Sequence, residues 1–257
     1  MRSSLLFIIS FPCFFVYLLL PSLCAYAQPP TEINSALASL EKYRSSGEPS
    51  FLKTSLSSVD ALMAFYECGA GDTRQDALSA TAYSADLAYQ ATGDRKYLDF
   101  TRSLAERLIN NLESSQTGPY QGRSMAVAVL MDLYHITGSE VYRENALAGL
   151  KGLPANSPAA RKCRETSYEF IVIGPTGSAG TEELLKKSFM FEEPCRVVVV
   201  LEPLRDKARL DELGYEYKGE PILYVCSEKA CFPPVAPGDG LKMTREYIKN
   251  VKEMEKR

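Results

Sequence analysis

A short motif that recurs three times in the first part of the chain limits the folds it can adopt. The three copies, which start 46 and 45 residues apart, are Ser46-Gly-Glu-Pro-Ser-Phe-Leu52, Thr92-Gly-Asp-Arg-Lys-Tyr-Leu98 and Thr137-Gly-Ser-Glu-Val-Tyr142. The glycine suits the left-handed position that ends a helix, and the acidic residue suits the start of the next helix. A period of about 45 residues with such a hinge predicts stacked helical hairpins.

Apolar residues follow helical spacing throughout this part of the chain. The clearest predicted hairpin pairs residues 75–91 with 97–112, and the next pairs 124–136 with 141–150. A closed ring of six hairpins would need roughly 270 residues at this period, more than twice the length of the helical part. The helical part is therefore expected to be an open arc, a partial α/α toroid, whose edges are covered by the rest of the chain or by another chain.

Three continuous apolar runs follow, at residues 168–173, 196–201 and 222–226. Such runs are typical of parallel strands buried on both faces. A glycine-rich turn and a helical segment separate the first run from the second, and residues 205–213 lead to the third. The pattern predicts a three-stranded parallel βαβ layer, followed by an amphipathic C-terminal helix. The predicted fold is thus mainly α with a small α/β module.

The N-terminus has the three-part pattern of a secretory signal. Arg2 precedes an apolar run from Leu5 to Leu20, and Ala25-Tyr-Ala27 offers small residues for cleavage after Ala27. The protein is then secreted or periplasmic and leaves the membrane after cleavage, with an uncleaved anchor as the alternative. The expected segments are the signal peptide 1–27, the α/α-hairpin domain 28–153, a linker 154–165 and the C-terminal α/β module 166–257.

Charge and histidine content exclude several functions. The formal net charge is −3, and no basic stripe is present to neutralise phosphates, which excludes nucleic acid as a partner. The single histidine, His135, excludes a two-histidine metal site. The glycines at 174, 177 and 180 match neither a dinucleotide nor a Walker motif, which favours a plain turn over an anion site. We expect no cofactor and no metal.

Five cysteines remain after signal cleavage, at positions 68, 163, 195, 226 and 231. Cys226 and Cys231 suit a short disulfide-closed loop, with separate buried thiols or a redox or metal role as alternatives. Cys163 and Cys195 precede the first two predicted strands, so parallel neighbours would bring them to one sheet edge as a second candidate disulfide. Cys68 would then be the spare thiol.

Asp86 and Asp132 are weak candidates for catalysis. They occupy corresponding helices one repeat apart, so both can face the concave side of the arc. Glycoside hydrolysis needs two carboxylates about 5 to 10 Å apart across a cleft. The alternative is that both are solvent-facing carboxylates on helix surfaces. The many tyrosines likewise suit either a sugar-binding groove or a core.

The segment Tyr224-Val-Cys-Ser-Glu-Lys-Ala-Cys-Phe-Pro-Pro-Val235 resembles the C-terminal signature of the spermatogenesis-associated protein 20 family of thioredoxin-domain-containing proteins. Upstream, the three segments Glu169-Phe-Ile-Val-Ile-Gly174, Thr181-Glu-Glu-Leu-Leu-Lys186 and Arg196-Val-Val-Val-Val200 look like that family's final α/β module. The hairpins look like the last part of its helical toroid, which is similar to six-hairpin glycosidase and acylglucosamine epimerase folds. The family's thioredoxin-like domain, its CxxC motif and more than half of the toroid have no counterpart in this sequence.

These observations favour a binding or interaction protein without catalytic activity, with the concave side of the arc as its contact surface. A protein that completes the toroid and a carbohydrate are the candidate partners. The competing hypothesis is a carbohydrate-active enzyme, glycosidase or epimerase-like, that uses carboxylates on the concave face. A third hypothesis is thiol redox chemistry at Cys226 and Cys231.

Overall fold

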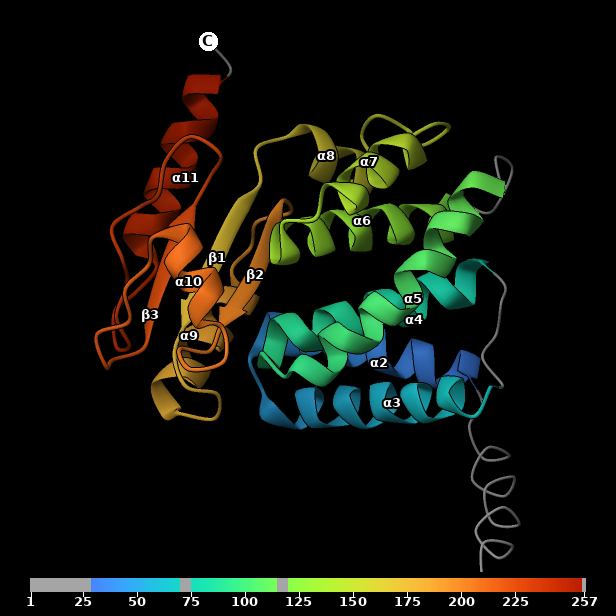
Figure 1. Cartoon of the computed structure of the whole chain (residues 1–257), viewed down its shortest axis with the longest axis horizontal. Helices are drawn as coiled ribbons and strands as arrows, with labels where there is room; N and C mark the ends of the chain where they lie inside the picture. Colours follow the sequence, from blue (N-terminus) through green and yellow to red (C-terminus); the bar gives the residue numbers. More distant parts are fainter. Residues whose placement is uncertain (1–28, 70–74, 115–119, 256–257) are drawn as a thin grey trace, which may run out of the picture.

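The structure is a computed structural model that describes residues 29–69, 75–114 and 120–255 (Figure 1). The expected signal peptide therefore lies outside the described residues. The described chain is mainly helical, with one small mixed sheet, as the sequence predicts at this level. Among the described helices, none combines the length and the apolar character that crossing a bilayer requires.

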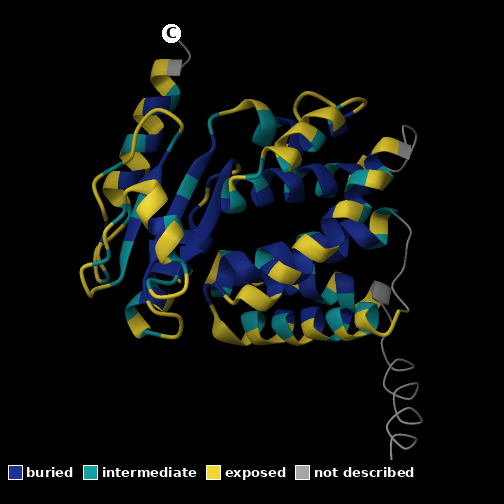
Figure 2. Cartoon of the chain, in the orientation of Figure 1, coloured by how far each residue is buried: buried dark blue, intermediate teal, exposed yellow. Residues whose placement is uncertain are grey.

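Six helices form three consecutive hairpins that are stacked side by side (Figure 1). The hairpins are α2 (Pro29–Ser46) with α3 (Pro49–Glu67), α4 (Gln75–Thr92) with α5 (Arg95–Ser114), and α6 (Tyr120–Thr137) with α7 (Glu140–Gly149). The first helix of each hairpin contacts the first helix of the next, which gives an inner row of α2, α4 and α6. Helix α4 is enclosed by neighbours, and 12 of its 18 residues are buried (Figure 2).

The three repeated motifs form equivalent hinges between the paired helices. Gly47, Gly93 and Gly138 have φ angles of 67°, 70° and 75°, the left-handed region that glycine adopts without strain. Each glycine donates its N–H at 2.7 Å to the carbonyl of a tyrosine four residues earlier, at Tyr43, Tyr89 or Tyr134. The predicted hinge at the end of each first helix is confirmed.

All three hinges also press against the C-terminal part of the chain. A Cβ added at Gly47 would lie 2.7 Å from the Lys186 side chain, and one at Gly93 would lie 2.8 Å from Cγ1 of Val200. At Gly138 the nearest atom would be a guanidinium nitrogen of Arg209, at 3.0 Å. All three positions need glycine for backbone conformation, and Gly93 also needs it for close approach, because the Val200 side chain is short and branched.

The sheet contains three strands in the order β2-β1-β3. They are β1 (Tyr168–Ile173), β2 (Arg196–Leu201) and β3 (Ile222–Cys226). The first two are parallel and joined by α9 (Ala179–Met190), as predicted. The third is antiparallel to β1, so the prediction of an all-parallel layer is wrong.

The chain does not return along the sheet between β2 and β3. Residues 202–221, which include helix α10 (Lys207–Leu213), stay at the end of the sheet at which β2 ends. The chain enters β3 at Ile222, which pairs with Ile173 at the end of β1.

Strand β2 lies at the edge of the sheet, and α4 covers that edge. The Val198 N–H donates to the Gln90 side-chain oxygen at 3.2 Å, and the Val200 N–H donates to the Tyr89 hydroxyl at 3.1 Å. Side chains of a helix thus take the place of a neighbouring strand, which removes an edge that would otherwise be open for pairing. This contact fixes the sheet on the inner row of helices.

Two further helices complete the described chain. Helix α8 (Pro158–Arg164) lies within the segment that we expected to be a linker, and it packs on α6. Its first turn is capped by Ser157, whose hydroxyl accepts from the Ala160 N–H at 3.2 Å. Helix α11 (Lys242–Glu255) is the predicted amphipathic helix, and it buries Ile248 and Val251.

Candidate functional site

Asp86 and Asp132 do converge, but inside the molecule. Both are fully buried, Asp86 on α4 and Asp132 on α6. The Gln90 side-chain amide donates to Asp86 at 2.8 Å and to Asp132 at 3.3 Å. The ammonium of Lys162, from α8, forms an ion pair with Asp132. We call these four residues the carboxylate cluster.

The electrostatics of the carboxylate cluster follow from its burial. Desolvation raises the pKa of Asp86 well above its ordinary value, and the neighbouring Asp132 charge raises it further. Asp86 therefore keeps a proton that it can share with Asp132. Burial alone would lower the pKa of Lys162, but the charges of Asp132 and Asp86 outweigh burial and raise it. One ammonium thus compensates one carboxylate.

The position of the carboxylate cluster corrects two of our expectations. Neither carboxylate is on a solvent-facing helix surface, and neither faces an open concave side. The inner row of helices is covered instead by α8, α9 and β2 (Figure 1). Gln90 contacts both carboxylates and also β2, so the cluster joins α4, α6, α8 and the sheet.

One predicted disulfide is present and the other is not. Cys226 and Cys231 are bonded, with their Cα atoms 3.9 Å apart, and the Tyr215 hydroxyl lies 3.3 Å from Cys226 Sγ. Cys163 and Cys195 are free thiols, so the second predicted pair is wrong. Cys68 is itself disulfide-bonded and is not the spare thiol.

The register of the sheet explains why Cys163 and Cys195 do not meet. Arg196 pairs with Tyr168, which places Cys195 beside residue 167, whereas Cys163 lies farther back, in helix α8. Burial raises the pKa of Cys163 to about 11 and that of Cys195 to about 12. Both thiols therefore stay protonated at neutral pH and are poor nucleophiles.

The glycine-rich turn between β1 and α9 is capped by a serine and contacts two prolines. The Ser178 hydroxyl caps α9 by accepting from the Thr181 N–H at 3.3 Å. A Cβ added at Gly180 would lie 3.0 Å from Pro237 and 3.1 Å from Pro221. Gly180 therefore packs closely against these two prolines.

His135 lies in the last turn of α6, where the sequence places it. Its Nδ1 is 2.8 Å from Oε1 of Glu169, on β1, so the histidine links the helical array to the sheet. Among the described residues, no group of three or more histidine, cysteine or acidic side chains is arranged to hold a metal ion.

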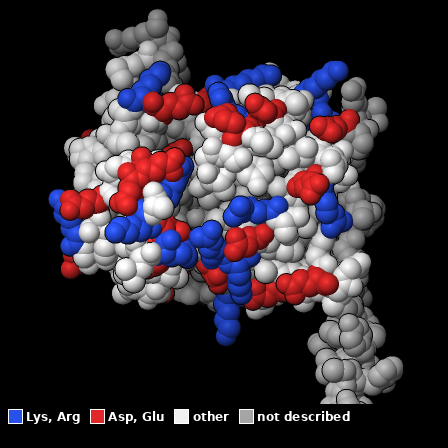
Figure 3. Space-filling view, viewed as in Figure 1, with Lys and Arg blue, Asp and Glu red and all other residues white. Residues whose placement is uncertain are grey.

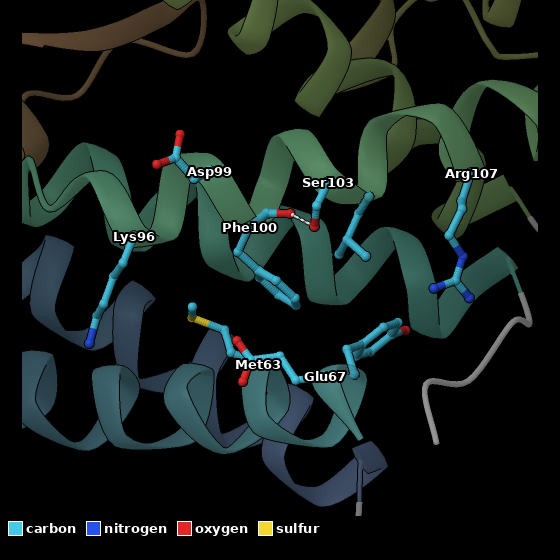
Figure 4. A pocket seen from close by; sticks show the side chains of 9 residues that line it. Met63, Glu67, Lys96, Asp99, Phe100, Ser103 and Arg107 are labelled. Carbon is cyan, nitrogen blue, oxygen red and sulfur yellow. Dashed lines mark hydrogen bonds between the residues drawn. The ribbon is translucent and has the colours of Figure 1, made fainter. Parts of the chain in front are cut away.

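An open groove of about 470 Å³ runs between α3 and α5 on the outer side of the array (Figure 4). Met63 and Phe100 face each other across it, and Tyr66 packs edge-on against Phe100 with the ring centroids 5.9 Å apart. Charged side chains of both signs form its rim, namely Glu67, Lys96, Asp99 and Arg107. We call this feature the α3–α5 groove.

A second groove, of about 250 Å³, lies where β2 ends. Hinge residues around Gly93 and Gly138 form one side and α10 forms the other. Its charged lining residues are Arg95, Arg102, Arg205, Arg209 and Asp206. We call it the arginine groove. Sequence reasoning missed it because its arginines come from segments about 110 residues apart, and its one local signal is Arg95 directly after the second hinge.

No family model and no curated protein sequence matches this chain. The geometry of the carboxylate cluster and of the two grooves is therefore the basis for any functional conclusion.

Proposed function

We propose that this chain is a secreted or periplasmic binding protein without catalytic activity, and that the α3–α5 groove is its contact surface. One observation carries the proposal. The two converging carboxylates are enclosed in the core, whereas the α3–α5 groove presents apolar and aromatic side chains at an opening. A binding module needs such a surface, and a hydrolase needs accessible carboxylates.

The shape of the groove favours an amphipathic helix of another polypeptide as the occupant. Its α5 lining residues recur once per turn from Lys96 to Arg107, which corresponds to a length of about 16 Å along the helix axis. A helix laid along this groove would place apolar residues at i, i+3 or i+4 and i+7 against Met63 and Tyr66, the partly exposed apolar residues of its lining. The mixed charges of the rim suit a partner helix whose flanks carry both signs.

The hairpin geometry supports a relation to toroid proteins. Three hinges with the same glycine conformation and the same tyrosine contact are what one repeated unit of an α/α toroid would produce. We therefore keep the resemblance to the C-terminal part of the thioredoxin-domain-containing family as part of the proposal.

Selection from a displayed library of amphipathic helical peptides tests the α3–α5 groove. Peptides selected on the full chain are measured by fluorescence anisotropy against Ser103→Arg, which places a long side chain in the groove from an exposed position. We expect at least tenfold weaker binding because the peptide and the arginine compete for the same space. Ser103→Ala, and Glu106→Arg on the exposed part of α5 outside the groove, should bind as the wild type does.

Two results would contradict this proposal. One is the absence of any selected peptide with micromolar affinity. The other is equal affinity of the selected peptides for Ser103→Arg and for the wild type. Because residue 103 is exposed, thermal unfolding of the variant should match that of the wild type, and this control separates loss of binding from loss of fold.

The convergence of Asp86 and Asp132 favours a carbohydrate-active enzyme as the second candidate function. A carboxyl group with a raised pKa beside a second carboxylate is the arrangement of an acid–base pair. A substrate would have to enter past Tyr83 and Lys162, which are partly exposed. Hydrolysis of a chromogenic glycoside by the wild type, abolished in a folded Asp86→Asn variant, would favour this function over the first.

A further inference from the structure

The arginine groove lies where ligands commonly bind in sheets with parallel strands. It is lined by Val199, Val200 and Leu201, the last residues of β2, which is parallel to β1. In open α/β sheets, ligands bind beyond the carboxyl ends of the parallel strands. At this edge the sheet meets two of the three hinges, so the groove has walls from both parts of the molecule.

Positive charge is concentrated in this groove, although the whole chain carries a net charge of −3. Four arginines and one acidic residue, Asp206, are among its lining residues, an excess of three positive charges. Figure 3 shows basic side chains gathered where α10 meets the start of α5. Asp99 and Glu212 compensate part of this excess: Asp99 lies 3.7 Å from Arg95 and 3.8 Å from Arg102, and Glu212 lies 2.7 Å from Arg209.

Asp206 orients two of the arginines. Its carboxylate accepts from Arg95 at 3.2 Å and from Arg205 at 2.6 Å, and it also accepts from the Glu202 N–H at 2.8 Å. These bonds hold both guanidinium groups in place at the end of β2. A guanidinium carries five N–H groups, so each of the two retains donors for a ligand.

Arg102 and Arg209 provide most of the other N–H donors that a ligand could use. The Arg102 guanidinium forms one long ion pair, with Asp99 at 3.8 Å. Arg209 donates to Glu212 through Nη1, while its Nη2 lies over Gly138, where glycine leaves room for it. The two groups approach the groove from opposite walls, α5 and α10.

The number and type of these donors indicate which chemical class of ligand the groove can bind. Planar guanidinium groups bind phosphate and carboxylate oxygens in pairs of parallel hydrogen bonds. Four such groups offer more donors than one carboxylate can accept, whereas a phosphate monoester presents three terminal oxygens. Leu98, Ile136 and Leu201 add an apolar floor beside them, which suits the carbon part of an ester.

We propose that the arginine groove binds a small phosphomonoester, with the phosphate held by Arg95, Arg102, Arg205 and Arg209. The volume of about 250 Å³ limits the ligand to a phosphate with a short or single-ring organic group. This inference goes beyond the proposed function, because the arginine groove and the α3–α5 groove have no lining residue in common.

Isothermal titration of the full chain with phenyl phosphate, in phosphate-free buffer at low ionic strength, tests this site. We expect phenyl phosphate to bind more tightly than inorganic phosphate, because the apolar floor contacts the ring, and more tightly than benzoate, which has fewer acceptor oxygens. Arg209→Gln and, separately, Arg102→Gln should each weaken binding at least tenfold. Arg143→Gln, which removes the same charge from an exposed site on α7, should leave binding unchanged.

Several outcomes would overturn the proposal. Absence of phenyl phosphate binding at millimolar concentration would exclude the site. Equal weakening by Arg143→Gln would show that only the overall charge matters. Equal affinity for phenyl phosphate and inorganic phosphate would exclude the role of the apolar floor, and benzoate binding as tightly as phenyl phosphate would exclude selection for phosphate. Thermal unfolding identifies any variant that fails to fold. If one of the two arginine variants fails, binding by the other tests the proposal.

Discussion

The carboxylate cluster and the arginine groove are two charged regions of one small protein, and they differ in how their charges are compensated. In the cluster, Asp132 is paired with Lys162, and burial raises the pKa of Asp86 and so favours its uncharged form. In the groove, four arginines face one lining aspartate, and the side chains of Arg95 and Arg102 are about half exposed, at 44% and 46%.

This difference distinguishes charges that the protein compensates internally from charges that remain available to a ligand. A buried charge must be compensated by the protein itself because water cannot solvate it. An excess of like charge persists where solvent screens it, and such an excess is available to a ligand. The two carboxylates that the sequence suggests for catalysis are thus enclosed in the core, whereas Arg95 and Arg102 are open to solvent.

The largest expected effect comes from breaking the ion pair of the carboxylate cluster. Asp132→Asn leaves the Lys162 ammonium without its carboxylate in a site where only 11% of the lysine side chain is exposed. Removing one partner of a buried pair lowers the free energy of unfolding by about 3–5 kcal/mol. Chemical denaturation of the variant and the wild type measures this loss.

A double variant makes that test specific. Asp132→Asn with Lys162→Met removes both charges, so it should recover part of the lost stability. A loss below about 1 kcal/mol in the single variant would mean that this pair contributes no more to stability than an exposed ion pair does. The contrast between the two charged regions would then fail.

The positions of most elements follow directly from the sequence. Gly47, Gly93 and Gly138 predict the hinges because left-handed backbone at a helix end strongly favours glycine. The three apolar runs predict the strands because few other segments are apolar without interruption. The orientation of β3 depends on where residues 202–221 lead the chain, which no local pattern reveals.

The burial of Asp86 is harder to predict from the sequence, although one feature of α4 indicates it. Helix α4 carries alanine, serine and threonine on nearly all sides, and a helix without a polar face is typically buried all round. Read in this way, its sequence indicates that Asp86 lies in the core. What covers the helix cannot be derived locally, because Gln90 meets β2 across 108 positions of the chain.

A smaller effect is expected from the matching change in the arginine groove. Asp206→Asn removes one carboxylate from Arg95 and Arg205, but these arginines remain partly solvated, with side chains 44% and 33% exposed. The asparagine oxygen can still accept from the Glu202 N–H. We expect a loss of about 1 kcal/mol in the free energy of unfolding, measured by the same denaturation.

This variant also separates stability from ligand binding. Removing Asp206 increases the positive charge of the groove, so phenyl phosphate should bind more tightly although the protein is less stable. A loss of stability as large as that of Asp132→Asn would show that the groove is a second structural ion cluster. Weaker phosphate binding would show that the orientation of the arginines matters more than their excess charge.

At pH 5 the smallest effect is expected at Asp86, and this effect depends on pH. Because the native pKa of Asp86 is raised, the folded state holds a proton that the unfolded state releases above about pH 4. Wild-type stability should therefore fall as pH rises from that value toward the native pKa. Asp86→Asn imitates the protonated carboxyl in size and can keep the contacts with Gln90 and Asp132, so it should change stability by less than about 1 kcal/mol at pH 5.

The difference between Asp86→Asn and the wild type should then move in favour of the variant as pH increases, by about 1.4 kcal/mol for each unit by which the native pKa is raised. Denaturation at several pH values between 4 and 9 measures this trend. A difference that stays constant with pH would mean that Asp86 titrates as an ordinary solvated carboxylate. The carboxylate cluster would then be open to water, as the arginine groove is, and its two acids would return as candidates for chemistry.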